Sequence, residues 1–309
     1  MSLSQRAQPL GRELMLQKYE IFSNILLKKL YLYRKFRFMT IIEAIEKRKS
    51  IRNYTGEPLR QEHISLITDY IAGLKTPFDA PPVRIQLIHS RQESGRIKLG
   101  TYGFIGGATD FLTLVYEKKS LFPLMEEAAA YTFEQLILFC TGLGLGTCWL
   151  GGSFSRKDFA EPVQLKPNEI LRIVSPVGYI NSKSRFTEMI LRQKGRHLYR
   201  KPFESLFFCG NFDKPLSKEL AGIYEKPLEM VRIAPSANNQ QSWRIILDGR
   251  CLHFYQHISV IGFNAIDLGI ALCHFEQTCK ELAIPGQFKV LDNKAPKRKG
   301  EKYVISWTE

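Results

Sequence analysis

Two stretches that lie far apart in the chain hold the polar side chains best suited to binding a ligand. Arg48, Ser50 and Arg52 alternate along one stretch, and the loop from Ala234 to Trp243 (APSANNQQSW) places two asparagines and two glutamines beside a proline and a tryptophan. A guanidinium offers a fixed charge and paired donors, and a carboxamide offers both a donor and an acceptor. These groups could hold a polar ligand from two sides if the fold brings the stretches together.

Composition narrows the kind of partner. The chain of 309 residues has 44 Lys and Arg against 30 Asp and Glu, a net charge of +14, and eight of those basic residues fall in the first 38 positions with two Glu. The remaining, moderately basic body suits nucleic acid, a membrane surface or a small phosphorylated ligand. No zinc-finger spacing, RNP-like aromatic motif or helix-turn-helix pattern supports nucleic acid, so none is expected as a partner.

The six cysteines form no C-x-x-C pair, and no signal peptide precedes them. We therefore expect reduced thiols in a cytoplasmic protein and no metal site. No stretch reaches the roughly 18 uninterrupted apolar residues of a membrane span. With 44% hydrophobic residues, the chain has ample material for a core.

Residues 12–38 have the pattern of a basic amphipathic helix, with apolar residues three and four apart and Lys and Arg gathered at the end. This leader could lie on an anionic membrane, pack on the body of the protein, or be absent from the native product if Met39 is the true start. We favour the last alternative, since Met39 opens the first well-formed helix. Membrane association is not expected.

From Met39 onward the pattern predicts alternating helices and strands. Thr40 and Glu43 have the spacing of a capping box at the start of a helix, and Asp248-Gly249 marks a hairpin turn. The sequence GLGLG closes a long apolar helix as a C-cap would and is not a dinucleotide loop, because no strand precedes it. Further helices are expected within 59–74, 226–233 and 264–284, and strands at 83–89, 110–117, 170–180, 244–256 (the hairpin) and 302–307.

Three matches in the same order suggest an internal repeat. Residues 74–88 align without gaps on 234–248, the tripeptide FEQ recurs at 133–135 and 275–277, and a Pro-Leu pair stands upstream in each part. The parts have divided their polar residues, since the first keeps Arg48, Ser50 and Arg52 and the second keeps the loop of Pro235, Ser236 and Asn239. One site built across both copies fits that division.

These motifs resemble those of the flavin-dependent nitroreductase family, in which an N-terminal helix ends R-x-S-x-R and a later loop reads P-S-x-x-N-x-Q-P-W. Arg48–Arg52 carry the first motif, and Pro235–Trp243 carry the second with Ser242 in place of its last proline. Gly144–Trp149 resemble the family's G-L-G-T-x-W element and are followed by Leu150-Gly151-Gly152. The resemblance extends from Met39 to the C-terminus.

The order of the motifs departs from that of ordinary members, which carry the second motif shortly after the first and form homodimers with the flavin at the interface. The chain is instead similar to the internally duplicated, fused-dimer branch known as the putative TM nitroreductases. The resemblance implies an α+β, nitroreductase-like FMN-binding fold, in which two diverged copies form a pseudo-dimer around a mixed, mainly antiparallel sheet flanked by helices. The expected parts are the leader (1–38), a first half (39–203) and a shorter second half (204–309).

The resemblance also implies the cofactor site. Arg48, Ser50 and Arg200 would hold the FMN phosphate and Arg52 would lie over the pyrimidine edge of the flavin. The remaining cofactor-binding residues would be Trp149, Leu150, Gly151 and Gly152 near flavin N5, and Pro235, Ser236 and Asn239 from the other copy.

Each assignment has an ordinary structural alternative. The arginines could be solvated surface charges, Ser236 and Asn239 could cap a helix, and Trp149 could be core packing. Gln241 and Trp243 are expected to brace the loop. Cys148 is assigned to packing, because no His stands near it to act as a base.

The implied activity is FMN-dependent oxidoreduction, with NAD(P)H as reductant and a nitroaromatic, a quinone or a similar flat small molecule as acceptor, in a ping-pong cycle. The cofactor carries the chemistry, so no catalytic residue is nominated. The fused-dimer resemblance implies a monomer that acts as a pseudo-dimer. Two other accounts remain open: a flavin store or redox sensor without turnover, and a membrane-surface adaptor that uses the leader.

Overall fold

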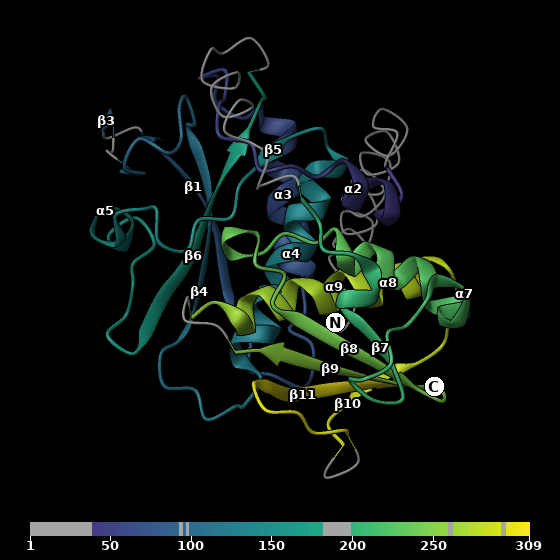
Figure 1. Ribbon diagram of the computed structural model, residues 1–309. Coiled ribbons are helices and arrows are strands. Elements are labelled where there is room, and N and C mark those ends of the chain that lie inside the picture. The colour runs from purple at the N-terminus through teal and green to yellow at the C-terminus, as the bar shows by residue number, and fades with distance from the viewer. Residues whose placement is uncertain (1–38, 93–94, 97–98, 182–198, 259–261, 292–294) are drawn as a thin grey trace, which may run out of the picture. The chain divides into compact units, whose positions relative to one another are not determined.

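The structure, a computed structural model, describes residues 39–92, 95–96, 99–181, 199–258, 262–291 and 295–309 (Figure 1). The expected leader, residues 1–38, and most of the connector that precedes Tyr199 lie outside the described residues. Residues Thr40–Glu309 form one compact unit. No described helix is both long enough and apolar enough to cross a membrane.

The elements of the first part run from α2 to β6. Their bounds are α2 Ile41–Lys47, α3 Gln61–Gly73, β1 Arg84–His89, β2 Arg91–Gln92, β3 Gly95–Arg96, β4 Asp110–Glu117, α4 Met125–Gly142, β5 Gly146–Thr147, α5 Arg156–Ala160 and β6 Glu169–Gly178. The remaining elements are the 3-10 turn η2 Phe203–Ser205, β7 Phe207–Cys209, α7 Lys218–Ala221, η3 Gly222–Tyr224, α8 Glu225–Arg232, η4 Ala237–Asn239, β8 Trp243–Asp248, β9 Cys251–His257, α9 Asn264–Glu281, β10 Gln287–Lys289 and β11 Glu301–Thr308.

Local signals in the sequence produce several of these elements as predicted. At α2, Thr40 Oγ1 accepts a hydrogen bond from Glu43 N and the Glu43 carboxylate accepts one from Thr40 N, so the capping box is complete. In the β8–β9 hairpin Asp248 pairs with Cys251, which leaves a two-residue turn whose first residue is Gly249, with φ of 59°. A glycine adopts that left-handed conformation without strain.

The main strands divide between two sheets, whereas the sequence predicts a single mixed one. One sheet has the order β1-β4-β6-β5 and is antiparallel throughout, and the other has the order β10-β11-β9-β8-β7, in which only the β7–β8 pair is parallel. The prediction of one mixed sheet is therefore wrong. The two sheets are kept apart because each has its own long helix, α4 or α9, packed on it.

The helices α4 and α9 pack against each other in the centre of the unit, as Figure 1 shows, with α3 beside the first and α8 beside the second. Gly269 of α9 permits this approach, since a Cβ there would lie 2.2 Å from Glu127 O and 2.8 Å from Ala130 Cβ. Both helices are buried along most of their length, which agrees with the apolar run predicted for α4. The unit is thus layered as sheet, helix, helix and sheet.

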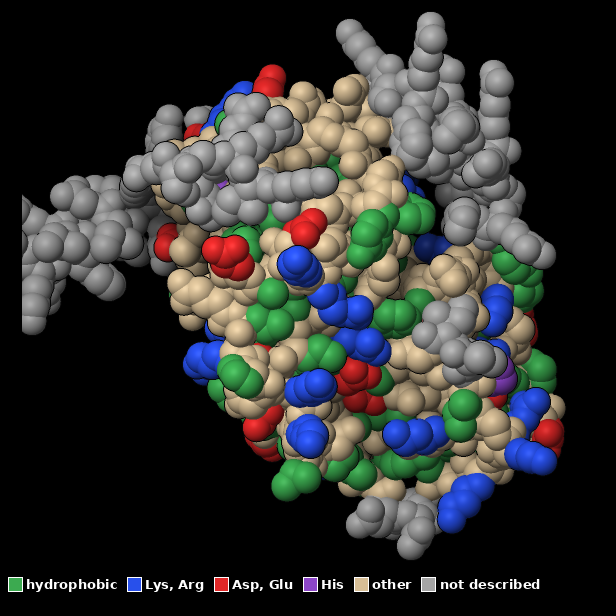
Figure 2. Space-filling model, turned by 90° about the vertical axis from the view of Figure 1, so that its left-hand side faces the viewer, with side chains coloured by type: hydrophobic (Ala, Val, Ile, Leu, Met, Phe, Trp, Pro, Cys, Tyr) green, Lys and Arg blue, Asp and Glu red, His purple; other side chains and the backbone are tan. Residues whose placement is uncertain are grey.

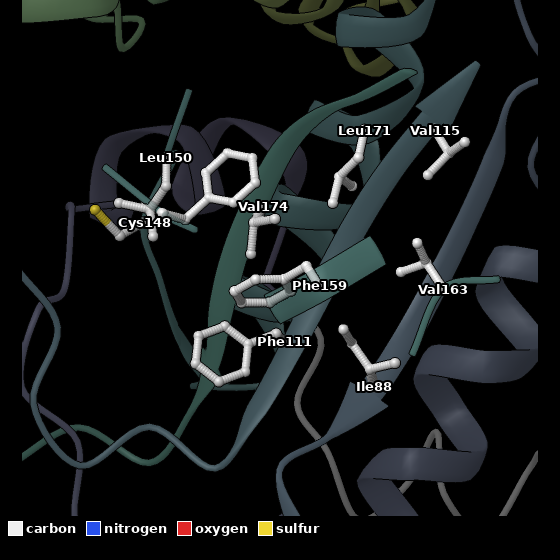
Figure 3. Close-up of a cluster of buried hydrophobic side chains, with 10 residues drawn as sticks. Ile88, Phe111, Val115, Cys148, Leu150, Phe159, Val163, Leu171 and Val174 are labelled. Carbon is white, nitrogen blue, oxygen red and sulfur yellow. The ribbon is translucent and has the colours of Figure 1, made fainter. Parts of the chain in front are cut away.

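A second apolar cluster covers the face of β4 and β6 on the side of α5. In Figure 3, Phe159 of α5 points toward Phe111 and Val174 of this sheet, and Cys148 and Leu150 belong to the same cluster. Phe159 contacts Phe111 edge to face, with ring centroids 5.3 Å apart. Cys148, only 2% exposed, is therefore a packing residue, as its sequence context predicts.

Candidate functional site

The end of α2 places a cation in the interior. Arg48 is 8% exposed, and its Nε and Nη1 atoms have no hydrogen-bond partner among the described residues. Burial lowers the pKa of Arg48, and Glu134 and Cys148 oppose that shift through their charges. A buried guanidinium without partners is costly, so the chemistry of this position fits an anionic ligand that would complete its hydrogen bonds.

A second arginine stands beside the first and contacts the predicted loop. Arg200 Nη1 donates to Asn239 Oδ1 at 2.5 Å and Nη2 donates to Ile233 O at 3.1 Å. Burial, followed by the charges of Arg48 and Arg232, lowers the pKa of Arg200 to about 10. Like charges repel unless an anion lies between them. The structure therefore brings Arg48, Arg200 and Asn239 together from the two separate stretches.

The loop is braced by Gln241, as its sequence context predicts. Gln241 is 1% exposed, its Oε1 accepts from Lys201 N at 2.8 Å, and its N–H donates to Ser236 Oγ at 2.9 Å. The Ser236 hydroxyl therefore bonds within the loop, and it makes no side-chain cap on the short η4 turn that follows it. Asn238 and Asn239, with φ of 50° and 57°, adopt the left-handed conformation that asparagine tolerates.

A buried carboxyl at the start of α9 anchors the same loop. Asp267 Oδ1 accepts from Ala237 N at 2.8 Å, and its Oδ2 accepts from the Ser242 hydroxyl at 3.1 Å. Burial raises the pKa of Asp267 to about 7, and these two hydrogen bonds oppose the rise. Ser242, which stands where the resembling family has proline, is thus used as a donor.

The segment with Ser50 and Arg52 runs beside β5. Ile51 N donates to Thr147 O at 2.8 Å, and Ser50 and Thr147 form a parallel bridge. Burial raises the pKa of the Cys148 thiol, and the charges of Arg52 and Arg48 and a hydrogen bond from Ser50 oppose the rise. Arg48, Ser50 and Arg52 therefore gather around the Cys148 position.

Trp149 is held by a buried polar network that the sequence did not suggest. Its indole N–H donates to Glu134 Oε2 at 2.8 Å, while Glu134 Oε1 lies 2.8 Å from His274 Nε2. His274 Nδ1 lies 2.9 Å from Met230 O, so Nδ1 must carry a hydrogen and the contact with Glu134 needs one more. Both Glu134 and His274 are fully buried, and this network joins α4, α8 and α9 behind Arg48.

The other predicted residues take different places. Leu150 N donates to Val174 O at 2.9 Å and its side chain lies in the cluster of Figure 3, so both are committed to the core. Gly151 packs on Phe263, whose ring would be 2.5 Å from a Cβ there, whereas Gly152 is exposed with no heavy atom within 4 Å of such a Cβ. Pro235 is half-buried at the start of the loop.

Glu134, His274 and Asp267 are the site residues that sequence reasoning missed. Glu134 belongs to the repeated FEQ tripeptide, so the signal was present but was used only as evidence of duplication. Lys and Arg side chains are also spread over the face seen in Figure 2, where they stand among Asp and Glu side chains. The arginines of the site differ from such surface charges because Arg48 is buried and unpaired.

The fold and these paired arginines define an α+β protein with a buried cationic site that can receive an anion. Comparison with known proteins is more specific, since residues 40–279 match the family described as putative TM nitroreductase. This match spans more than half of the chain, and the chain belongs to that family. A search of the curated proteins finds no match to this sequence.

Solved structures show the same fold. A putative nitroreductase from Thermotoga maritima is 22% identical with a TM-score of 0.56, and the match covers 87% of this chain and 94% of that one. A nitroreductase family protein from Clostridium difficile is 20% identical with a TM-score of 0.39, over 50% of this chain and 93% of its own. An FMN-dependent nitroreductase from Clostridium difficile is 16% identical with a TM-score of 0.36, over 46% and 88%.

Proposed function

We propose that the chain is an FMN-dependent oxidoreductase that uses NAD(P)H as reductant and a flat small molecule, such as a nitroaromatic or a quinone, as acceptor. Membership of the nitroreductase family supports oxidoreduction. The observation that carries the flavin assignment is Arg48, whose buried Nε and Nη1 atoms lack partners while Arg200 stands beside it. When bound, FMN would supply hydride chemistry at its N5 atom, accepting from NAD(P)H and delivering to the acceptor in a ping-pong cycle.

The residues of this chain would bind and orient the cofactor. Arg48 and Arg200 would hold the phosphate, because two guanidinium groups supply charge and several directed donors. Asn239 is already fixed by its bond from Arg200. Arg52 would place a positive charge near the ring, and Pro235 and Ser236 would approach the ring from the second half of the chain.

We further propose that residues 39–203 and 204–309 are diverged copies of one unit. Their strand orders correspond, since β1-β4-β6-β5 of the first sheet matches β8-β9-β11-β10 of the second, with a long helix in each between the second and third strands of the pair. Arg84 of β1 pairs with Glu169 at the start of β6, and Arg244 of β8 is influenced by Glu301 at the start of β11. The gap-free alignment of 74–88 on 234–248 makes these two arginines equivalent.

The decisive experiment measures flavin content and turnover in the purified protein. We expect a flavin absorption spectrum, release of FMN on denaturation, and oxidation of NADH or NADPH that depends on an added nitroaromatic or quinone. A bound flavin without turnover, across a panel of acceptors, would favour a flavin store or redox sensor. A colourless protein that does not bind added FMN would refute the proposal.

A further inference from the structure

A cavity of about 700 Å³ lies away from the arginine site. It is bounded by the end of α3, the loop that follows α3, and facing residues of α4, α9 and β10. Its volume is in the range of small-molecule pockets. The flavin assignment uses none of the residues that line it.

The loop beside this cavity is the counterpart of the loop at the proposed flavin site. The gap-free alignment of 74–88 on 234–248 sets Phe78 on Asn238 and Asp79 on Asn239. All four residues have positive φ, at 63° and 56° in the first pair and 50° and 57° in the second. A bulky Phe adopts this conformation at a cost, so the shared backbone shape points to common descent of the two loops.

The other walls correspond as well. Glu276 of α9 lines the cavity and is the FEQ equivalent of Glu134, which lies behind Arg48. Glu276 accepts a hydrogen bond from the Tyr131 hydroxyl of α4, as Glu134 reaches across to His274 of α9. The strand β10, which also lines the cavity, matches β5 of the flavin site in sheet position. The cavity is therefore at the position that a second flavin site would take in a symmetric dimer.

Its chemistry differs from that of the arginine site. No arginine is among the described residues that line the cavity, so it offers no guanidinium pair for a phosphate. Its charged groups are Asp69, Asp79 and Glu276 against Lys75 and Lys280. Because Lys280 Nζ lies 3.1 Å from Glu276 Oε1, these two offset each other. The remaining lining charges leave a negative surplus.

Aromatic rings supply the apolar surface. Phe78 contacts Tyr131 and Phe288 edge to face, with centroids 5.7 Å and 5.5 Å apart, and Tyr70 lines the same cavity. Rings beside carboxylates favour flat, positively charged molecules through stacking and cation–π attraction. We propose that this cavity binds a planar aromatic cation that carries no phosphate. The proposal rests on the duplication stated above and not on flavin turnover.

The test is a calorimetric titration of the full chain, saturated with FMN, using proflavine as a planar aromatic cation. We expect saturable binding of one proflavine per chain, and at least about tenfold weaker binding of pyranine, a planar aromatic anion. Phe288→Leu and Asp69→Lys should each weaken proflavine binding by about tenfold. Glu57→Lys makes the same charge change at an exposed site outside the cavity and should leave the affinity unchanged.

Two results would overturn the proposal: the absence of saturable proflavine binding, or binding that FMN displaces and that ignores Phe288→Leu and Asp69→Lys. Since Phe288 packs on Phe254, Phe275 and Trp307, thermal unfolding checks the fold of its variant, and Asp69→Lys on the exposed face of α3 gives an independent reading. Binding that depends on these residues in a protein without flavin would support this site while refuting the proposed flavin function.

Discussion

At the residue scale, Arg48 shows how a position can be poor for stability and still suit a ligand. Its guanidinium is buried beside Arg200 with two nitrogen atoms unpartnered. Replacing a buried charge with an apolar side chain of similar length is often neutral or stabilising. Removal of its charged hydrogen bonds to a phosphate should weaken binding by about 1.5–3 kcal/mol.

We therefore predict that Arg48→Met lowers FMN affinity at least about tenfold while the flavin-free protein unfolds at an unchanged or higher temperature. Quenching of flavin fluorescence gives the affinity, and thermal unfolding gives the stability. Arg250→Met is a matched control, since Arg250 lies exposed at the β8–β9 turn. A variant with normal affinity and reduced stability would assign Arg48 a structural role only.

Asp267 makes a prediction about pH. Burial raises the pKa of its carboxyl from 3.8 to about 7, so the folded chain holds this proton more tightly than the unfolded chain. Stability from this group is fully present below about pH 4 and is lost as the pH rises to about 7. At about 1.4 kcal/mol per pKa unit, the loss is roughly 4 kcal/mol.

Asp267→Asn cannot ionise, so the wild-type free energy of unfolding should fall relative to that of the variant by roughly this amount between pH 4 and pH 8. Urea unfolding of both proteins across this range measures the difference. Asp213→Asn, at an exposed position, should show no comparable trend. A difference between wild type and Asp267→Asn that is flat with pH would contradict the raised pKa.

At the scale of elements, the contact between α4 and α9 depends on one missing side chain. A Cβ at Gly269 would lie 2.2 Å from Glu127 O, a backbone atom that cannot move without shifting α4. Since Glu134 and His274 bridge the same two helices, any separation also disturbs the network behind Arg48.

Gly269→Ala should thus destabilise the protein by about 1–3 kcal/mol and lower its flavin content. Gly142→Ala is the control, because Gly142 lies at the end of α4 with no heavy atom within 4 Å of an added Cβ. It should be neutral or stabilising by about 0.4–1 kcal/mol. Denaturant unfolding compares the two, and equal effects would mean that the helices yield at this contact.

The elements were predictable from local signals, and their partners were not. The capping box of Thr40 and Glu43 and the Asp248-Gly249 turn each act within a few residues, so the sequence states them directly. The pairing of Glu134 with His274 depends on how two helices, far apart in sequence, are packed together. The left-handed Phe78 was equally hidden, because a phenylalanine carries none of the glycine or asparagine signal for that conformation.

The site was predicted unevenly for the same reason. The two separated polar stretches suggested a shared site, and Arg48, Arg200 and Asn239 do come together. Leu150 was nominated from its motif, yet its N–H and side chain serve the first sheet and its core. A motif identifies the neighbourhood of a ligand, whereas the direction of each side chain depends on strand pairing that the motif does not contain.

At the scale of the whole molecule, two loops of the same backbone shape lie in different surroundings. The loop of Asn239 meets Arg200 and Arg48, and the loop of Asp79 borders a cavity in which no described residue is an arginine. A phosphate dianion placed beside Asp79 and Asp69 would meet repulsion without a guanidinium to offset it. The molecule as a whole should therefore hold one FMN.

We predict one FMN per chain in a monomer that is competent without a partner copy. Native mass spectrometry gives the mass of the loaded species, and flavin released by acid, measured against protein concentration, gives the ratio. Removing the arginine site with Arg48→Met should empty the protein of FMN and leave no second, weaker flavin population. Two flavins per chain, or flavin bound only by a dimer, would mean that the cavity beside Asp79 or an interface between chains still binds the phosphate.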